Sequence, residues 1–104
     1  MALSKYARKF DMKCMGWTNT KSYNLMFVKH QENYFNDLLR MRGYVFLRDV
    51  YEGLGFPITR DSCIAGWMID EQNVAVVQFT IQETDGSDLI LDFNAEENIL
   101  DKFE

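Results

Sequence analysis

The sequence predicts an α+β fold, with a three- to four-stranded antiparallel meander and helices packed on one face. Apolar residues recur at helical spacing in the first part of the chain. In the last part they alternate with polar residues, as in half-buried strands. The 104 residues are 47% hydrophobic and 26% charged, with one proline, a composition that can bury a core. We therefore expect one α+β domain over residues 1–104.

The N-terminal segment is predicted to form a basic amphipathic helix over residues 3–13. Its apolar residues recur at i, i+3, i+4 and i+7 and are Leu3, Tyr6, Ala7 and Phe10. Such a helix would fit an anionic membrane surface, nucleic acid or the acidic C-terminal half of its own chain. The pattern leaves these alternatives open.

A long helix is predicted over residues 23–42. Ser22 is its expected N-cap, and Gly43 follows it at the position where a left-handed conformation costs little. Its expected apolar stripe comprises Leu25, Val28, Phe35 and Leu39, broadened by Phe27, Tyr34, Leu38 and Met41. Because short apolar runs are ambiguous, residues 23–28 could instead form a strand.

Glycine and proline divide the middle of the chain. Residues 44–46 suit a short strand because they are β-branched and aromatic, and residues 47–54 repeat the helical spacing. Gly55 then supplies a left-handed cap, and Pro57 prevents the helix from continuing. We expect another short helix over residues 59–65, capped by the threonine that begins it.

The C-terminal part is predicted to contain most of the sheet. A strand over residues 67–69 leads into a turn over 70–73. Residues 77–82 and 89–93 then alternate apolar and polar side chains, which is typical of a half-buried hairpin.

The register of this hairpin depends on the length of its loop. A two-residue loop would pair Phe79 with Asp92 and place a carboxylate on the apolar face. A three-residue loop over 84–86 avoids this and places Gly86 where a left-handed residue is needed. The expected pairs are Ile81 with Leu89, Phe79 with Leu91 and Val77 with Phe93.

The net charge of −5 is unevenly distributed along the chain. Residues 1–60 carry ten Lys/Arg and five Asp/Glu, or +5, whereas residues 61–104 carry one Lys/Arg and eleven Asp/Glu, or −10. This split suggests an electrostatic contact with a partner, although two halves that face and neutralise each other would give the same count. The candidate partner-binding residues are Lys5, Arg8, Lys9, Asp88 and Asp92.

Residues with catalytic or metal-binding chemistry are scarce. Cys14, Cys63 and His30 are scattered along the chain and fall short of the four ligands of a structural zinc site. The sequence contains no nucleophile motif, phosphate-binding glycine loop or calcium loop. We expect free thiols, no metal, no cofactor and no enzymatic activity.

Residues 47–67 also resemble the helix-turn-helix pattern of DNA-binding proteins. Two positions depart from that pattern, because Tyr51 replaces a small residue and Asp61 an aliphatic one. Arg48 and Arg60 favour phosphate contact, but neighbouring acids oppose it. Helix packing without DNA contact explains the pattern equally well.

A set of short motifs resembles a known family. In order along the chain these are Asn36, Tyr44-Val45-Phe46-Leu47, Tyr51, Leu54-Gly55, Gly66-Trp67, Ile69-Asp70 and Leu91-Asp92-Phe93. Together, over residues 31–93, they resemble the C-terminal domain of an uncharacterised family encoded by phages and prophages of gut and other Gram-positive bacteria. The resemblance implies an origin and no mechanism, and it transfers no functional residue.

These observations lead to one principal hypothesis and one alternative. The principal hypothesis is a non-enzymatic interaction protein of phage or mobile-element origin that contacts a protein partner, for example as an inhibitor of a host factor. The alternative is a small helix-turn-helix-like DNA-binding regulator. No apolar run approaches the ~18 to 20 residues of a membrane span, and no secretory leader is evident. We therefore expect a location in the bacterial cytoplasm, without membrane contact, and leave self-association open.

Overall fold

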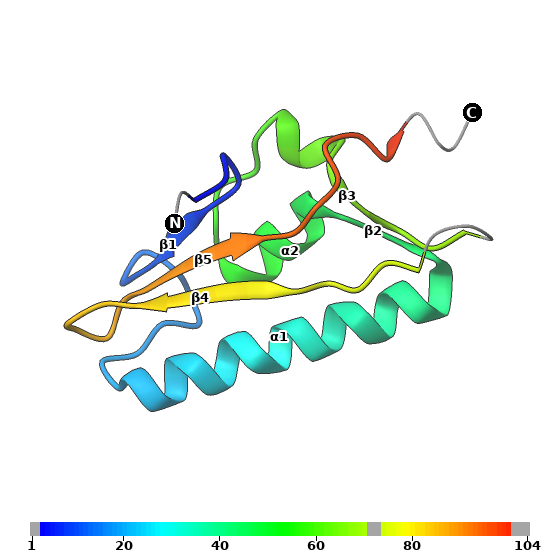
Figure 1. Cartoon of the computed structure of the whole chain (residues 1–104). Helices are drawn as coiled ribbons and strands as arrows, with labels where there is room; N and C mark the ends of the chain where they lie inside the picture. The colour runs from blue at the N-terminus through cyan, green and yellow to red at the C-terminus, as the bar shows by residue number, and fades with distance from the viewer. Residues whose placement is uncertain (1–2, 71–73, 101–104) are drawn as a thin grey trace.

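The computed structural model describes residues 3–70 and 74–100. Within them the elements are β1 (Arg8–Phe10), α1 (Lys21–Arg42), β2 (Tyr44–Phe46), α2 (Leu47–Leu54), the 3-10 helix η1 (Asp61–Cys63), β3 (Gly66–Met68), β4 (Phe79–Glu83) and β5 (Leu89–Phe93). The strands form two antiparallel sheets, ordered β1-β5-β4 and β2-β3, and α1 runs beside β4 (Figure 1). The predicted α+β class is confirmed, but the strands divide between two sheets instead of forming one meander.

The N-terminal segment is a strand, so the predicted helix over residues 3–13 is wrong. β1 pairs with β5, with Arg8 opposite Leu91 and Phe10 opposite Leu89. Tyr6 and Phe10 are both buried. Phe10 lies in β1, whereas Tyr6 lies in the turn before it, where the amide of Ala7 donates to the carbonyl of Ser4 at 3.1 Å. The pairing of β1 with β5 replaces the predicted helix, because it satisfies backbone groups and buries Phe10.

Helix α1 begins at Lys21, after Thr20, and the predicted N-cap Ser22 lies inside its first turn. The strand alternative for residues 23–28 is therefore wrong. At the other end Gly43 has φ 84°, and its amide donates to the carbonyl of Leu39 at 2.7 Å. The predicted left-handed C-terminal cap is confirmed.

The elements that follow α1 match their predictions closely. β2 and α2 occupy the predicted residues 44–46 and 47–54, and Gly55 has φ 87°. The short helix expected over residues 59–65 shortens to the single 3-10 turn of η1. Thr59 holds this turn, since its side-chain oxygen accepts from the amide of Ser62 at 3.2 Å.

This short turn removes the structural basis of the helix-turn-helix hypothesis. In that motif a second helix enters the major groove of DNA. Here α2 is followed by residues 55–60, which are not helical, and then by the three residues of η1. Residues 47–67 therefore contain no recognition helix.

Strand β3 pairs with β2 and does not extend the hairpin, with Val45 opposite Trp67. The predicted strand over 67–69 thus exists one residue earlier, but in the smaller sheet. Of the turn expected over residues 70–73, residues 71–73 lie outside the described residues.

The β4–β5 hairpin keeps the predicted faces but not the predicted register. Ile81 pairs with Leu91 and Phe79 with Phe93, so every partner is shifted by two residues. The connection spans residues 84–88, and Gly86 does not have a positive φ.

Helix α1 explains the longer hairpin loop. Lys21 donates from Nζ to the carbonyl of Thr84 at 2.7 Å, and Asn24 donates from Nδ2 to the carbonyl of Ser87 at 2.8 Å. Within the loop, Thr84 Oγ1 donates to the carbonyl of Asp88 at 2.7 Å. These hydrogen bonds give the carbonyls of the five-residue loop the partners that they would otherwise lack.

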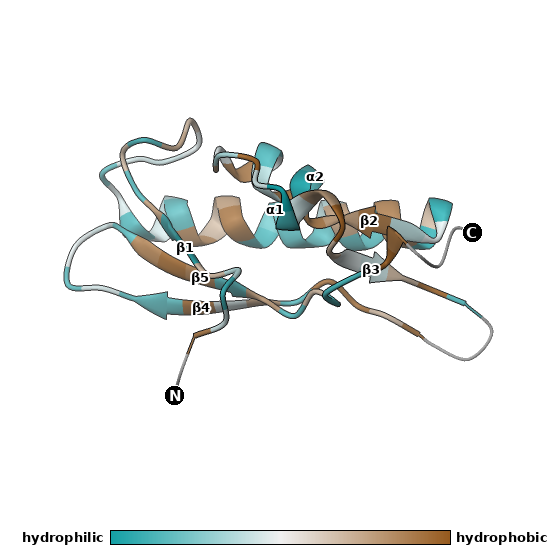
Figure 2. Cartoon of the chain, turned by 90° about the horizontal axis from the view of Figure 1, so that it is seen from above, coloured by the Kyte–Doolittle hydropathy of each residue, from teal (hydrophilic) through white to brown (hydrophobic). Residues whose placement is uncertain are grey.

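The core lies between the three-stranded sheet and the two helices. Its largest fully buried side chains include Trp67, Tyr51, Phe10, Leu39, Leu47, Leu54, Leu89 and Leu91. Tyr51 contacts the rings of Phe56 and Phe93 edge to face, each at 5.7 Å between centroids. In Figure 2 apolar residues mark β5, whereas apolar and polar bands alternate along α1. Tyr23, Met26, Tyr34 and Met41 are exposed, so α1 carries apolar side chains on more than its inner face.

Candidate functional site

The predicted charged residues meet one another, because β1 lies beside β5. Lys9 Nζ lies 3.5 Å from Asp88 Oδ2, and Lys5 Nζ lies 3.8 Å from Glu97 Oε1. Lys21 and Glu83 form a third pair of this kind, at 3.6 Å. Each pair joins the basic half of the sequence to the acidic half. These contacts support the interpretation that the two halves neutralise each other within one chain.

Arg8 and Asp92 are bound by their own chain. Arg8 Nη1 donates to the carbonyl of Ala7 at 2.8 Å, and its guanidinium lies 5.1 Å from the ring centre of Tyr51. Asp92 accepts from the backbone and side chain of Ser4. Burial raises the pKa of Asp92, but the hydrogen bonds from Ser4 and from the amide of Phe93 outweigh it and leave the pKa below its ordinary range.

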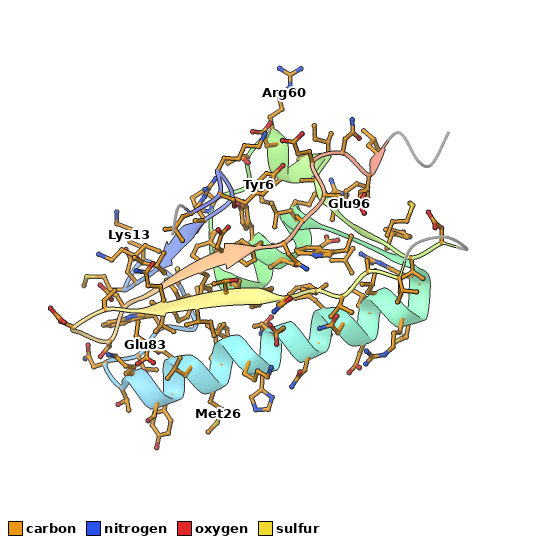
Figure 3. All side chains as sticks on the ribbon, in the orientation of Figure 1. Tyr6, Lys13, Met26, Arg60, Glu83 and Glu96 are labelled. Carbon is orange, nitrogen blue, oxygen red and sulfur yellow. The ribbon has the colours of Figure 1, made fainter. Side chains whose placement is uncertain are left out.

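A second set of side chains, which the sequence prediction assigned partly to the core, faces outward from α1. Tyr23, Met26, Tyr34 and Met41 are 62%, 56%, 58% and 81% exposed. Together with exposed His30, the first three of these residues are spaced three or four positions apart, at 23, 26, 30 and 34. Met41 lies seven residues, or two helical turns, beyond Tyr34 on the same side of the helix. We call these five residues the outer stripe of α1. Met26 points away from the sheet in Figure 3.

The outer stripe corrects one prediction. Tyr34 and Met41 were expected to broaden the buried stripe of the helix, but both are exposed. Val28, Phe35 and Leu39 fill the inner side instead. A helix that is apolar on both sides has more apolar residues than one core contact needs. That excess is the sequence signal from which the stripe could have been found.

A groove of about 340 Å³ runs between α1 and α2. It is lined by Gln31, Tyr34, Phe35, Leu38, Arg42, Asp49, Glu52 and Gly53, and we call it the α1–α2 groove. It meets the outer stripe at Tyr34. A Cβ at Gly53 would lie 3.0 Å from the ring of Phe35 and 2.9 Å from Gln31 Oε1, so the missing side chain lets the helices approach.

The charges at the α1–α2 groove are partly neutralised. Arg42 Nη2 lies 2.9 Å from Asp49 Oδ2. Glu52 is exposed and has no ion pair within residues 3–70 and 74–100. The groove therefore offers an apolar floor and one available carboxylate.

A second hollow, of about 310 Å³, lies beside β1. Its lining includes Arg8, Lys9, Asp11, Lys13 and Cys14. The side chain of Lys13, labelled in Figure 3, is exposed. Burial raises the pKa of the Cys14 thiol, which keeps it protonated at neutral pH. A protonated thiol is a weak nucleophile.

The part of the chain that the structure describes holds neither a cluster of metal-ligand residues nor a helix suited to spanning a membrane. No group of three or more His, Cys, Asp or Glu residues there could hold a metal ion. Cys14 and Cys63 are both free. Over residues 3–70 and 74–100, no helix combines the length and the apolar character needed to span a bilayer.

Comparison with known protein families matches residues 2–103 to one family. The chain belongs to DUF6353, a family of unknown function. The DUF6353 match extends beyond residues 31–93, the part that carries the resemblance noted above, and takes in almost the whole chain. No curated protein and no solved structure matches the chain. DUF6353 has no assigned function, so the family match does not indicate what this chain does.

Proposed function

We propose that this DUF6353 chain is a non-enzymatic interaction protein that binds another polypeptide through the outer stripe of α1 and the adjoining α1–α2 groove. The observation that carries the proposal is the exposure of four large apolar side chains on one side of a single helix. Exposed apolar side chains gathered on one side of an element mark interaction sites on soluble proteins more often than scattered exposed residues do.

The size of the stripe supports a specific contact. A full tyrosine or methionine side chain presents about 200 Å², so the exposed fractions of Tyr23, Met26, Tyr34 and Met41 leave about 500 Å² of mostly apolar surface. This lies within the range of about 300–600 Å² for the largest and often functional patch of a monomer.

The α1–α2 groove adds a place for an anchoring side chain. Phe35 and Leu38 line it, and Gly53 leaves one wall without a side chain. Exposed Glu52 favours a partner segment that carries a basic residue beside its apolar anchor. The charged residues chosen from the sequence are less suited to this role, because Lys9 and Asp88 already pair with each other.

The resemblance to phage- and prophage-encoded proteins supports a mobile-element origin, a bacterial cytoplasmic setting and a host factor among the partners. Genomic context tests the origin. Genes for capsid, tail or integration functions beside members of DUF6353 are expected, and consistent chromosomal housekeeping neighbours would contradict it.

Photo-cross-linking tests the proposed surface directly. A benzophenone amino acid in place of Tyr34 should capture a polypeptide in cells, whereas the same group at Thr80, on the outer face of the sheet, should not. Met26→Glu should abolish capture at position 34. Met15→Glu, at a residue 98% exposed outside α1, is the matched control and should leave capture unchanged. Equal capture at both positions, or capture that survives Met26→Glu, would refute the proposal.

A further inference from the structure

We infer that the polypeptide that binds the outer stripe is a second copy of this chain, with the two α1 helices antiparallel across a two-fold axis. The inference rests on the proposed function and names its partner. An isologous contact needs a surface that complements itself. The outer stripe meets this condition in its spacing, its charges and its area.

The spacing along α1 fits an antiparallel helix pair. Tyr23, His30, Tyr34 and Met41 of the outer stripe fall on the alternating four- and three-residue spacing of a coiled-coil seam. In an antiparallel pair centred near position 32, residues whose numbers sum to 64 face each other. Tyr23 then meets Met41 of the second copy, and His30 meets Tyr34.

Two amides fall beside the two-fold axis in this arrangement. Gln31 and Asn33 lie on opposite flanks of the seam, one position from its centre, so each lies beside its counterpart in the second copy. An amide both donates and accepts, which allows it to pair with an identical group.

The charges favour the antiparallel arrangement over a parallel one. Lys29 Nζ lies 2.7 Å from Glu32 Oε1, and Arg40 pairs with Asp37, so these charges are neutralised within each helix. A parallel pair would set Asp37 against Asp37 at the seam, and like charges in contact are unfavourable. In the antiparallel pair the two Asp37 residues lie ten positions apart along the helix axis, about 15 Å at 1.5 Å per residue.

The area is sufficient for a specific but weak dimer. From Tyr23 to Met41 the stripe extends about 27 Å along the helix at 1.5 Å per residue. The stripe contributes about 500 Å² from each copy, and the pair buries about 1,000 Å², near the lower limit for specific interfaces. We therefore expect a reversible dimer with micromolar affinity.

Sedimentation of the purified chain tests the inference. Between about 5 and 200 μM the mass should rise from the 12.3 kDa of one chain toward twice that value, equally in about 0.05 and 0.5 M NaCl. Met41→Glu should weaken the dimer at least tenfold, and Met15→Glu should not. A monomer at every concentration, a dimer that dissociates in salt, or a dimer unaffected by Met41→Glu would overturn the inference.

Disulfide trapping tests the orientation. A mixture of Tyr23→Cys and Met41→Cys chains should form a mixed cross-linked dimer, whereas each variant alone should not. The parent chain, with Cys14 and Cys63 in place, measures background oxidation. Cross-linking of Tyr23→Cys alone as fast as the mixture would indicate a parallel pair and overturn the inference.

The two proposals can fail separately. A purified chain that stays monomeric, while position 34 still captures another polypeptide in cells, overturns the second copy as partner but leaves the interaction surface. Loss of capture at position 34 overturns both.

Discussion

Replacing Tyr51 by phenylalanine should destabilise the fold by removing one hydrogen bond while keeping the aromatic ring. Tyr51 lies on α2, is 0% exposed, and donates from its hydroxyl to the carbonyl of Tyr6 at 2.7 Å. This is the contact that fastens the segment before β1 onto α2. The variant leaves the carbonyl of the buried Tyr6 without that donor.

The expected loss is about 1–2 kcal/mol, because an unsatisfied buried acceptor costs more than the net value of an ordinary hydrogen bond. For a domain of this size each kcal/mol lowers Tm by about 4–8 °C. The matched control is Tyr23→Phe, which removes a hydroxyl from a residue 62% exposed and should change stability by less than about 0.5 kcal/mol.

Urea unfolding at one fixed chain concentration, followed by circular dichroism, measures both variants. Its pH dependence adds a second readout, because burial raises the pKa of Tyr51 from 10.0 to about 12. A folded-state pKa above the unfolded value means that the protonated phenol stabilises the fold fully below pH 10. That contribution is lost as the pH rises from 10 to 12. The difference between the parent chain and Tyr51→Phe should therefore shrink across this window.

Two results would refute this reasoning. If Tyr51→Phe and Tyr23→Phe lost equal stability, the hydrogen bond to Tyr6 would contribute nothing specific. If the stability difference stayed constant from pH 9 to 12, burial would not hold the Tyr51 phenol in its protonated form.

Two further predictions concern the space around Gly66 and the pKa of Asp92. Gly66→Ala should cost more than about 3 kcal/mol in urea unfolding, because its Cβ would lie 2.2 Å from the carbonyl oxygen of Val45; Gly86→Ala, with nothing within 4 Å, should be neutral. Ser4→Ala should raise the pKa of Asp92 in an NMR titration, since its hydrogen bonds favour the ionised form. Ionised Asp92 stabilises the fold, and this stabilisation is lost as the pH falls through the pKa of Asp92. Ser4→Ala should make this stabilisation smaller. An unchanged pKa of Asp92 in the variant would contradict this explanation.

Local sequence signals were sufficient to predict the helices and the strand in the middle of the chain. Gly43 and Gly55 end their helices with positive φ, and these positions can be read from the sequence because a left-handed residue favours glycine wherever it occurs. α1, β2 and α2 were therefore predictable with nearly correct bounds. Their signals lie within a few residues of the structure that they produce.

The elements that sequence reasoning misplaced depend on distant partners. Phe10 belongs to a strand because Leu89 lies opposite, and nothing near Phe10 in sequence indicates this. The hairpin loop lengthens because Lys21 and Asn24 bind its carbonyls from α1.

The charged residues chosen from the sequence also depend on distant partners. Lys9 and Asp88 looked available because their mutual contact is visible only after folding. The outer stripe was overlooked because its residues matched the composition of a core. Spacing alone does not show which apolar side of α1 the sheet will cover.

The pairing of β1 with β5 also affects the order in which the chain can fold during synthesis. Arg8 and its partner Leu91 are 83 positions apart (91 − 8), which at about 5–20 residues per second means a delay of about 4–17 s. β5 is the central strand of its sheet, so both β1 and β4 remain without a neighbour until it is made. A nascent chain that stalls before Leu89 would therefore leave two unpaired strands open to other chains.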